Sequence, residues 1–180
     1  MTGSFEYNYA EALFELSLEN NCLESVYEEF SAVTQIFDEN PEFVKFLNLP
    51  TVEWVEKEKI ISKAFGDDLS DVMFSFLNIT AQKGRSKGIS LIFSEFKALY
   101  NEKMNILEVT ATTAVHLTDS LRKKLIEKLS AVSGKRIVLK ECVDSKIIGG
   151  IVLSYNNTEI HASVRDKLEK LKAQINSIAI

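Results

Sequence analysis

From residue 5 to residue 104 the hydrophobic residues recur at intervals of three and four, which is the spacing of one buried face on an α-helix. Glycine, proline and asparagine interrupt this pattern and separate one helical segment from the next. The pattern predicts six helices, at about residues 5–18, 23–37, 41–49, 51–65, 69–83 and 87–104. Six helices joined by short turns predict an all-α bundle, which we assign to residues 1–104.

The first predicted helix carries more hydrophobic surface than a peripheral helix of a small bundle needs. One stripe comprises Phe5, Tyr9, Ala12, Leu13 and Leu16. A second stripe beside it comprises Ala10, Phe14 and Leu18. Because one buried stripe is enough to hold a helix on a bundle, the other stripe either packs more deeply or is left for a partner.

Several residues have the preferences expected at helix ends. Asn40, followed by Pro41, is expected to cap the third helix, and Thr51 is expected to cap the fourth. Gly66 and Gly84 suit the positive φ that often ends a helix. These residues support the boundaries that the hydrophobic pattern predicts.

The period of the pattern changes near residue 105. Residues 106–115 alternate between apolar and polar side chains, which predicts a β-strand with one buried face. A helix capped by Thr118 and ended by Gly134 should follow, and then a strand at residues 136–143. The hydrophobic residues of this helix, expected to face inward, are Leu121, Leu125, Leu129 and Val132.

The remaining elements complete a small α+β domain, which we assign to residues 105–180. Residues 147–153 are nearly all apolar, which predicts a central strand covered on both faces. A tight turn at residues 156–157 and a short strand come next. Ser163 then resembles the start of a capping box for a C-terminal helix. The chain as a whole is therefore predicted to be α+β, with a six-helix bundle followed by a short mixed sheet and a last helix.

Charge divides the chain at the same place as the hydrophobic period. Residues 1–103 carry 9 basic and 18 acidic side chains, whereas residues 104–180 carry 12 basic and 8 acidic ones. The first 44 residues contain no lysine or arginine. Because nucleic-acid backbones require cations, nucleic acid is not expected as a partner of the first half. The contrast favours two units with different partners, although charged faces that only meet solvent would give the same counts.

Signatures of catalysis and metal binding are missing from the sequence. Residues 84–88 do not have the order of a phosphate-binding loop, and Gly149-Gly150 lacks the third glycine of a dinucleotide-binding turn. With only two histidines, a histidine-rich metal site cannot form. Cys22 and Cys142 are expected to be buried hydrophobic side chains rather than nucleophiles. We therefore expect no catalytic residues, no metal and no cofactor.

The longest apolar run, at residues 147–153, is far shorter than the roughly 20 residues that a transmembrane helix needs. The opening residues resemble neither a secretory signal nor a basic transit peptide. Any association with a membrane is therefore expected to occur through a partner.

Several segments, in order along the chain, are similar to the delta subunit family of bacterial F-type ATP synthase, which includes the mitochondrial oligomycin-sensitivity-conferring protein. Residues 9–14 resemble the family's opening Tyr-Ala-x-Ala-Leu-Phe, and residues 40–43 resemble the segment around its third helix. Asn8 stands where the family usually has arginine, and His161-Ala162 where it usually has Asp-Gly. The residues that match the family's structural signatures are Gly84, Arg85, Asp144, Gly149, Gly150 and Ser163.

The resemblance implies a non-catalytic stator subunit at the top of the peripheral stalk, on the cytoplasmic face of the bacterial cell membrane. Such a subunit holds the F1 head against rotor torque during proton-driven ATP synthesis. Its helical domain would bind the amino-terminal helix of an α subunit in a groove between the first and fifth helices. Its C-terminal domain would meet the C-terminal end of subunit b. Carried over by position, the groove residues are Tyr9, Ala12, Leu13 and Ile79.

A second interpretation stays open at this point. A helical adaptor or regulatory binding protein, unrelated to ATP synthase, could use the surplus hydrophobic stripe of the first helix on a different partner. Recovery of the chain together with α and b subunits would distinguish the stator from the adaptor.

Overall fold

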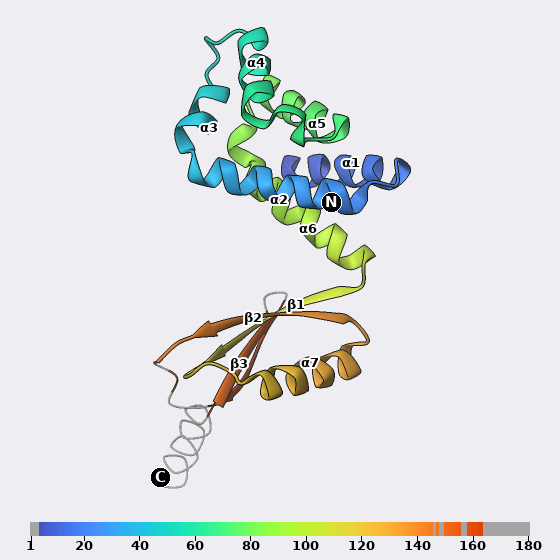
Figure 1. Ribbon diagram of the computed structural model, residues 1–180, viewed down its shortest axis with the longest axis vertical. Coiled ribbons are helices and arrows are strands. Elements are labelled where there is room, and N and C mark those ends of the chain that lie inside the picture. The colour runs from blue at the N-terminus through green and yellow to red at the C-terminus, as the bar shows by residue number, and fades with distance from the viewer. Residues whose placement is uncertain (1–3, 146, 148–149, 156–157, 164–180) are drawn as a thin grey trace, which may run out of the picture. The chain divides into compact units, whose positions relative to one another are not determined.

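The computed structural model of the chain describes residues 4–145, 147, 150–155 and 158–163 (Figure 1). The chain divides into two compact units, Met1–Asn101 and Glu102–Ile180. The first unit is built from α-helices, and the second contains a four-stranded mixed sheet with a helix. The fold class is α+β, as the sequence predicts.

The first unit is helical as far as the structure describes it, from residue 4 onward, and we call it the helical unit. Its α-helices are α1 (Phe5–Glu19), α2 (Leu23–Glu39), α3 (Pro41–Leu47), α4 (Trp54–Phe65), α5 (Asp71–Gln82) and α6 (Ile89–Lys103). Two short 3₁₀ turns, η1 (Gly66–Asp68) and η2 (Ser86–Gly88), precede α5 and α6.

A single hydrophobic core joins these helices, with aromatic rings at its centre. Phe30 of α2 is fully buried and packs edge to face against Phe76 of α5 and against Phe93 and Phe96 of α6, at ring centroid distances of 5.4, 5.1 and 5.6 Å. Each such pair is worth about 0.5–1.5 kcal/mol beyond the area that it buries. Burial of these rings fixes α5 and α6 against α2.

Helix α1 turns its second stripe and part of its first toward this core. Ala10 and Leu13 are buried, and Phe14 and Leu18 pack against the core with partial exposure. The outer part of the first stripe stays accessible, because Leu16 is 43% exposed and Ala12 is exposed as well. The surplus stripe of the sequence is therefore a surface of the helical unit.

One of the predicted helix caps is wrong, and another is confirmed in position only. Helix α4 begins at Trp54 rather than after Thr51, and Glu53 occupies the cap position without a side-chain hydrogen bond. Asn40 occupies the cap position of α3 ahead of Pro41, as predicted, but its side-chain nitrogen donates to the carbonyl of Ile36 at 2.8 Å. The side chain of Asn40 therefore satisfies the end of α2, whereas its backbone carbonyl accepts the N–H of Phe43 in α3 at 3.0 Å.

The glycine predictions for the helical unit are confirmed. Gly66 ends α4 with φ of 55°, and Gly84 follows α5 with φ of 63°. Both values lie in the region that favours glycine.

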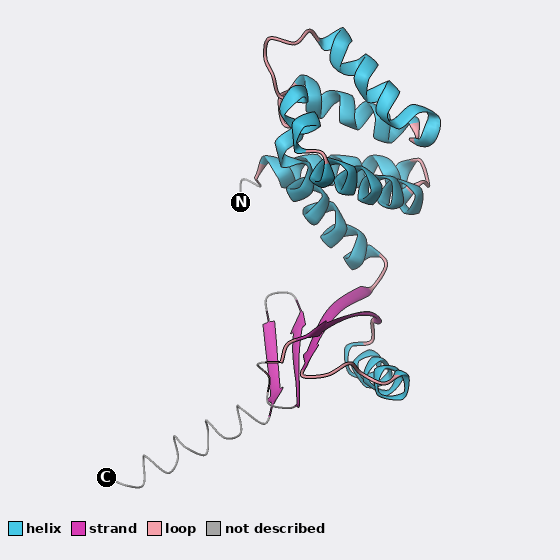
Figure 2. Cartoon of the chain, turned by 60° about the vertical axis from the view of Figure 1, so that its left-hand side comes forward, coloured by secondary structure: helices cyan, strands magenta, loops and turns pink. Residues whose placement is uncertain are grey.

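The sheet has the strand order β2-β1-β3-β4, and Figure 2 shows its strands with α7 beside them. Its strands are β1 (Ile106–Thr113), β2 (Arg136–Val143), β3 (Gly150–Tyr155) and β4 (Thr158–Ser163). β1 pairs in parallel with β2, so that Ile106 lies opposite Arg136, and β3 pairs antiparallel with both β1 and β4. Val109, Ala111 and Thr113 are the buried positions of β1, which confirms the predicted alternation.

Helix α7 (Asp119–Ser133) connects the two parallel strands and packs against β2. Thr118 caps it by accepting the N–H of Leu121 at 3.4 Å, and Gly134 ends it with φ of 67°, both as predicted. The inward orientation predicted for Leu121 and Val132 is wrong. Only the middle of the helix is partly covered, so that Val132 in the last turn is 89% exposed.

The predicted central strand is shifted and less covered than its composition suggests. β3 begins at Gly150, and Ile147 lies in the connection before it. β3 does lie between two other strands, but residues 151–155 are only partly buried rather than covered on both faces. The buried side chains of the described sheet lie instead on β1 and, at Ile137, on β2.

The hairpin between β3 and β4 is confirmed by the pairing of Tyr155 with Thr158, which leaves room only for a tight connection. The turn residues 156–157 and the C-terminal helix predicted after Ser163 lie outside the described residues. The buried position predicted for Cys142 is wrong. Its thiol is exposed on β2, an edge strand of the sheet, and Cys22 is partly buried.

Candidate functional site

A hollow of about 300 Å³ lies between α1 and α5 on the helical unit. Five residues of α1 and four of α5 line it. They are Asn8, Tyr9, Ala12, Leu13, Leu16, Val72, Ser75, Phe76 and Ile79. None of these nine side chains is charged. We call this surface the α1/α5 groove.

Helical spacing places the lining residues of each wall on one face. On α1 they fall at positions 8, 9, 12, 13 and 16, and on α5 at positions 72, 75, 76 and 79. Residues three and four apart are neighbours on a helix, so each wall is a continuous strip about two turns long. The exposed fractions are 50% for Ile79 and 43% for Leu16, which makes them the most accessible large hydrophobic residues of the groove.

Capping interactions fix where both walls begin. Ser4 accepts the N–H of Tyr7 at the start of α1, at 3.4 Å. At the start of α5 the hydroxyl of Ser70 accepts the N–H of Met73, and the same hydroxyl donates to Glu29 of α2 at 2.7 Å. The carboxylate of Glu29 also accepts the backbone N–H of Ser70 at 2.9 Å. The first turn of α5 is therefore tied to α2 as well as to the hydrophobic core.

The floor of the groove continues into the aromatic core. The ring of Tyr9 meets the ring of Phe76 edge to face, with the centroids 6.3 Å apart, and Phe76 in turn packs against Phe30. Phe76 is only 8% exposed. The floor is therefore held by core packing, and a bound group would meet a surface that is formed in advance.

The turn after α5 contacts the N-terminal part of α1, beside one end of the groove. The guanidinium of Arg85 lies over the rings of Phe5 and Tyr9, with its carbon 5.0 and 5.1 Å from their centroids. The backbone N–H of Arg85 donates to the carbonyl of Thr80 at 2.8 Å. A Cβ at Gly88 would lie 3.3 Å from the Phe5 ring, so this glycine allows η2 to approach α1 closely.

All four groove residues expected from the sequence line this hollow: Tyr9, Ala12, Leu13 and Ile79. Sequence reasoning missed the other five. Leu16 belongs to the same predicted stripe as Tyr9, so spacing alone could have identified it. Val72 and Phe76 lie seven and three residues before Ile79, but hydrophobic residues at this spacing are equally expected on the buried face of a bundle helix.

The described signature residues of the second unit lie at the ends of strands: Asp144 follows β2, Gly150 begins β3 and Ser163 ends β4. Gly150 is the first residue of β3, has φ of 96°, and pairs with Ser163, the last residue of β4. Asp144 donates its N–H to the carbonyl of Thr113 at 2.9 Å and accepts the N–H of Ile147 at 3.1 Å. Gly149 lies outside the described residues. These positions shape turns of the sheet.

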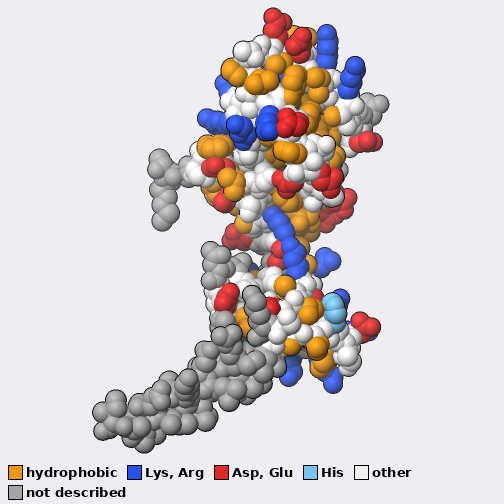
Figure 3. Space-filling view, turned by 90° about the vertical axis from the view of Figure 1, so that its left-hand side faces the viewer, with side chains coloured by type: hydrophobic (Ala, Val, Ile, Leu, Met, Phe, Trp, Pro, Cys, Tyr) orange, Lys and Arg blue, Asp and Glu red, His pale blue; other side chains and the backbone are white. Residues whose placement is uncertain are grey.

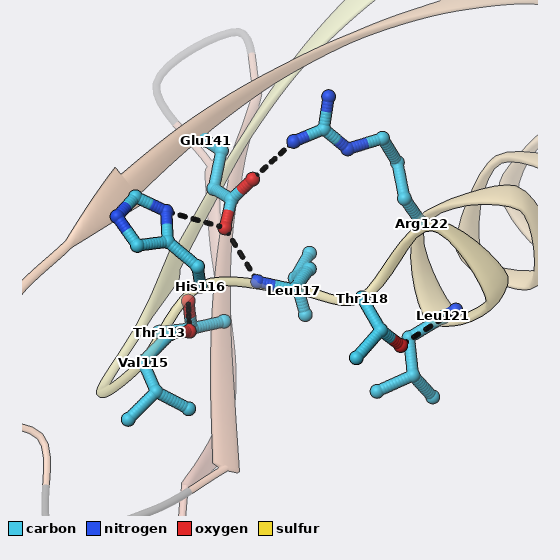
Figure 4. Close-up of polar contacts among 8 residues, drawn as sticks. All are labelled: Thr113, Val115, His116, Leu117, Thr118, Leu121, Arg122 and Glu141. Atoms are coloured by element: carbon cyan, nitrogen blue, oxygen red, sulfur yellow. Dashed lines mark hydrogen bonds and ion pairs between the residues drawn. The ribbon is translucent and has the colours of Figure 1, made fainter.

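A polar cluster ties the loop before α7 to β2 (Figure 4). The carboxylate of Glu141 accepts the backbone N–H of Leu117 at 2.6 Å, pairs with the guanidinium of Arg122, and lies 3.4 Å from Nδ1 of His116. The pKa of Glu141 lies below its usual range, mainly because its carboxylate accepts the hydrogen bond from Leu117. Arg122 and His116 lower this pKa further, whereas burial of the carboxylate acts to raise it. The cluster fixes the loop but leaves no unpaired acid or base.

Within residues 4–163, as far as the structure describes them, no three His, Cys, Asp or Glu side chains are grouped as a metal site requires. No described helix is both long enough and apolar enough to cross a membrane. Figure 3 shows hydrophobic side chains exposed on one face of the helical unit, among charged ones. Exposed hydrophobic side chains gathered on one face are typical of surfaces that contact another protein.

A profile of the ATP synthase delta (OSCP) subunit family matches residues 6–175 of the chain. Proteins named ATP synthase subunit delta are similar along nearly its whole length. That of Lachnoclostridium phytofermentans is 34% identical over 173 residues, covering 96% of this chain and 95% of that protein. That of Fusobacterium nucleatum is 33% identical over 161 residues, covering 89% and 92%.

The fold is similar to that of a chain in the cryo-EM structure of the Toxoplasma gondii mitochondrial ATP synthase hexamer. The TM-score is 0.73 at 19% sequence identity, and the likeness covers 96% of this chain and 98% of that chain. At this identity the likeness supports the arrangement of helices and strands, and no individual contact.

Proposed function

Because the chain belongs to the ATP synthase delta (OSCP) subunit family, a family of non-catalytic subunits, we propose that it is a stator subunit of the F1Fo complex. It links the F1 head to the peripheral stalk and resists the torque of the rotor during proton-driven ATP synthesis. It does so through protein contacts alone, without a cofactor.

The α1/α5 groove is the observation that most strongly supports this proposal. In our account it binds the amino-terminal helix of an α subunit. An amphipathic helix recognises a hydrophobic groove through side chains at positions such as i, i+4 and i+7. The lining residues of α1 and α5 offer such side chains an uncharged surface about two helical turns long, on which Leu16 and Ile79 are exposed.

The rigidity of the groove suits a contact that must carry load. Its floor packs into the aromatic core through Phe76, and the start of α5 is held by Glu29. A surface that is ordered before binding loses little conformational entropy when it is occupied, so more of the contact energy is available as affinity. A stator needs this property because its contacts must persist while the rotor turns.

We propose that the two units of the chain have separate partners. The helical domain, residues 1–104 with its bundle of six helices, faces the F1 head. The α+β domain, residues 105–180, meets the C-terminal end of subunit b. Their opposite net charges support different partner surfaces. Residues 1–103 carry 18 acidic and 9 basic side chains, whereas residues 104–180 carry 8 acidic and 12 basic ones. The protein is then a peripheral component at the cytoplasmic face of the bacterial membrane, held there by its partners.

Copurification tests the proposal. A tagged full-length chain, expressed in its own host, should recover the α and b subunits from membranes solubilised in mild detergent. Substitution of Ile79 by aspartate should reduce recovery of α more than recovery of b, because only the helical domain is changed. Recovery of an unrelated protein without α or b would instead support a helical adaptor and would contradict the stator.

A further inference from the structure

Arg85 places a positive charge at one end of the α1/α5 groove. Its guanidinium lies over Phe5 and Tyr9, and Tyr9 itself lines the groove. The side chain is exposed, and it forms no ion pair with any residue that the structure describes. A cation that touches the groove and has no carboxylate partner among the described residues is available to a bound molecule.

The rest of the groove has no comparable charge. Its nine lining residues are uncharged, and neither α1 nor α5 contains a lysine or an arginine. Acidic residues flank the lining residues along the length of the groove in sequence, with Glu6 and Glu11 near Tyr9, and Glu15, Glu19 and Asp71 near Leu16 and Val72. Arg85 is the positive charge that the described contacts place against a lining residue, Tyr9.

The contact with the two rings leaves the hydrogen-bonding capacity of Arg85 largely unused. An aromatic face attracts the cation as a whole, whereas a guanidinium carries five N–H donors in one plane. The preferred partner of such a fork is a carboxylate, which accepts two parallel hydrogen bonds. The rings also hold the side chain in place, so that less entropy is lost when a carboxylate binds.

We propose that Arg85 is a specificity-determining residue of the α1/α5 groove, and that the helix bound there presents an aspartate or glutamate to it. The carboxylate lies beside the apolar residues that fill the groove, at the end formed by Phe5 and Tyr9. A carboxylate elsewhere along the groove would have no such cation beside it, because neither α1 nor α5 contains a lysine or an arginine. The charge pattern thus fixes the register of the bound helix, which apolar contacts alone would leave free to slide.

This inference rests on the proposed function, and a double-mutant cycle separates the two. The probe is a synthetic peptide with the amino-terminal sequence of the α subunit from the same organism, titrated calorimetrically into the full-length chain. Arg85→Gln should weaken binding about fivefold, as expected for a partly exposed ion pair. Neutralising one particular carboxylate of the peptide should weaken binding as much, and the two changes together should cost little more than either alone.

Three further variants guard against other causes. Lys123→Gln removes one positive charge from α7 and should leave the affinity unchanged. Arg85→Lys keeps the charge but loses the planar fork, so it should retain only part of the affinity that Arg85→Gln loses. Phe5→Leu removes one ring contact while retaining the guanidinium, so it should weaken binding less than Arg85→Gln. Equal losses for Phe5→Leu and Arg85→Gln would mean that Arg85 only packs against α1.

The outcomes are distinguishable. A peptide that fails to bind the unaltered chain contradicts the proposed function itself. The role of Arg85 would be overturned if the peptide bound the Arg85→Gln chain as tightly as the unaltered chain. It would also be overturned if, for every carboxylate of the peptide, the loss of affinity from neutralising it simply added to the loss from Arg85→Gln. In both cases the groove would remain a docking site. Raised salt should weaken binding to the unaltered chain more than binding to the Arg85→Gln chain.

Discussion

The guanidinium carbon of Arg85 lies 5.1 Å from the centroid of the Tyr9 ring, which joins the turn after α5 to the second turn of α1. Tyr9 also meets Phe76 edge to face. The two contacts hold the N-terminal end of α1 against the C-terminal end of α5. The groove that these helices form is therefore a product of tertiary packing, and its walls respond to changes in either helix.

Replacing Ile79 by aspartate should weaken binding of the α-subunit peptide at least tenfold, because a charge would take the place of an apolar side chain at the groove surface. Since Ile79 is 50% exposed in the free chain, the thermal melt should change little. Calorimetry and circular dichroism measure the two effects separately.

Leu91→Asp is the matched control for that variant. Leu91 is 60% exposed on α6 and does not line the groove. Leu91→Asp should therefore leave the affinity for the α-subunit peptide unchanged. If Ile79→Asp collapses the melt, Ile79 is a core residue and the groove assignment loses its main support.

Replacing Phe76 by alanine should lower the free energy of unfolding of the helical unit by about 3 kcal/mol, the usual cost of removing a buried aromatic ring. Phe76 is 8% exposed and packs against Phe30 as well as Tyr9. Urea denaturation followed by circular dichroism measures the loss. Ser75→Ala, at a neighbouring exposed position of the groove, should cost far less, and similar losses for both would contradict the packing described.

Gly134→Ala tests the turn between α7 and β2. A Cβ would meet no atom within 4 Å there, so the cost comes from φ of 67° alone, and we expect about 1 kcal/mol. Gly134→Asn should cost less, because asparagine tolerates this conformation. Thermal denaturation of the two variants should rank them in that order, and the reverse order would exclude the left-handed turn.

The Glu141 cluster makes a prediction about pH. The pKa of Glu141 is lower in the folded chain than in the unfolded chain, chiefly because its carboxylate accepts the N–H of Leu117. The stabilisation is therefore present above the unfolded pKa and is lost as the pH falls through the folded pKa. Glu141→Gln should lower the melting temperature at neutral pH, and the difference from the unaltered chain should shrink in acid.

Glu127→Gln is the control for the pH series. Glu127 is exposed on α7 and has no hydrogen bond or ion pair with a described residue. This variant should melt like the unaltered chain at every pH. A constant deficit for Glu141→Gln down to strongly acidic pH would contradict the role of the carboxylate charge.

The sequence predicts the helices and strands well because most of them carry a clear hydrophobic period or a strong end signal. Strand β2 is predicted to the residue, and α7 has both its cap, Thr118, and its terminating glycine, Gly134. Thr51 fails as a cap because a good capping residue does not have to lie at a helix start. The side chain of Asn40 likewise found a carbonyl of the preceding helix instead.

Burial is harder to predict than secondary structure, because it depends on which elements meet. Composition marks residues 147–153 as a covered strand, yet β3 is only partly buried. Val132 has the spacing of a buried residue, but it lies beyond the part of α7 that is covered. Neither fact is visible in a one-dimensional pattern.

The groove shows the same division. The surplus stripe of α1 points to a docking face, and its residues Tyr9, Ala12 and Leu13 can be chosen from spacing and resemblance. Spacing and resemblance do not predict that Phe76 lines the groove or that Arg85 lies beside it, because both depend on how α5 packs against α1. The pair Gly84-Arg85 after a helix suggests a turn, whereas the contact of Arg85 with Phe5 and Tyr9 appears only in the folded chain.

Mapping the bound peptide on the protein tests the central claim most directly. In ¹⁵N-labelled full-length chain, addition of the α-subunit amino-terminal peptide should shift the amide resonances of the residues that line the α1/α5 groove, Ile79 and Leu16 among them, and leave those of β1 and β2 unchanged. Shifts confined to other helices, such as α4, or to the sheet would contradict the account.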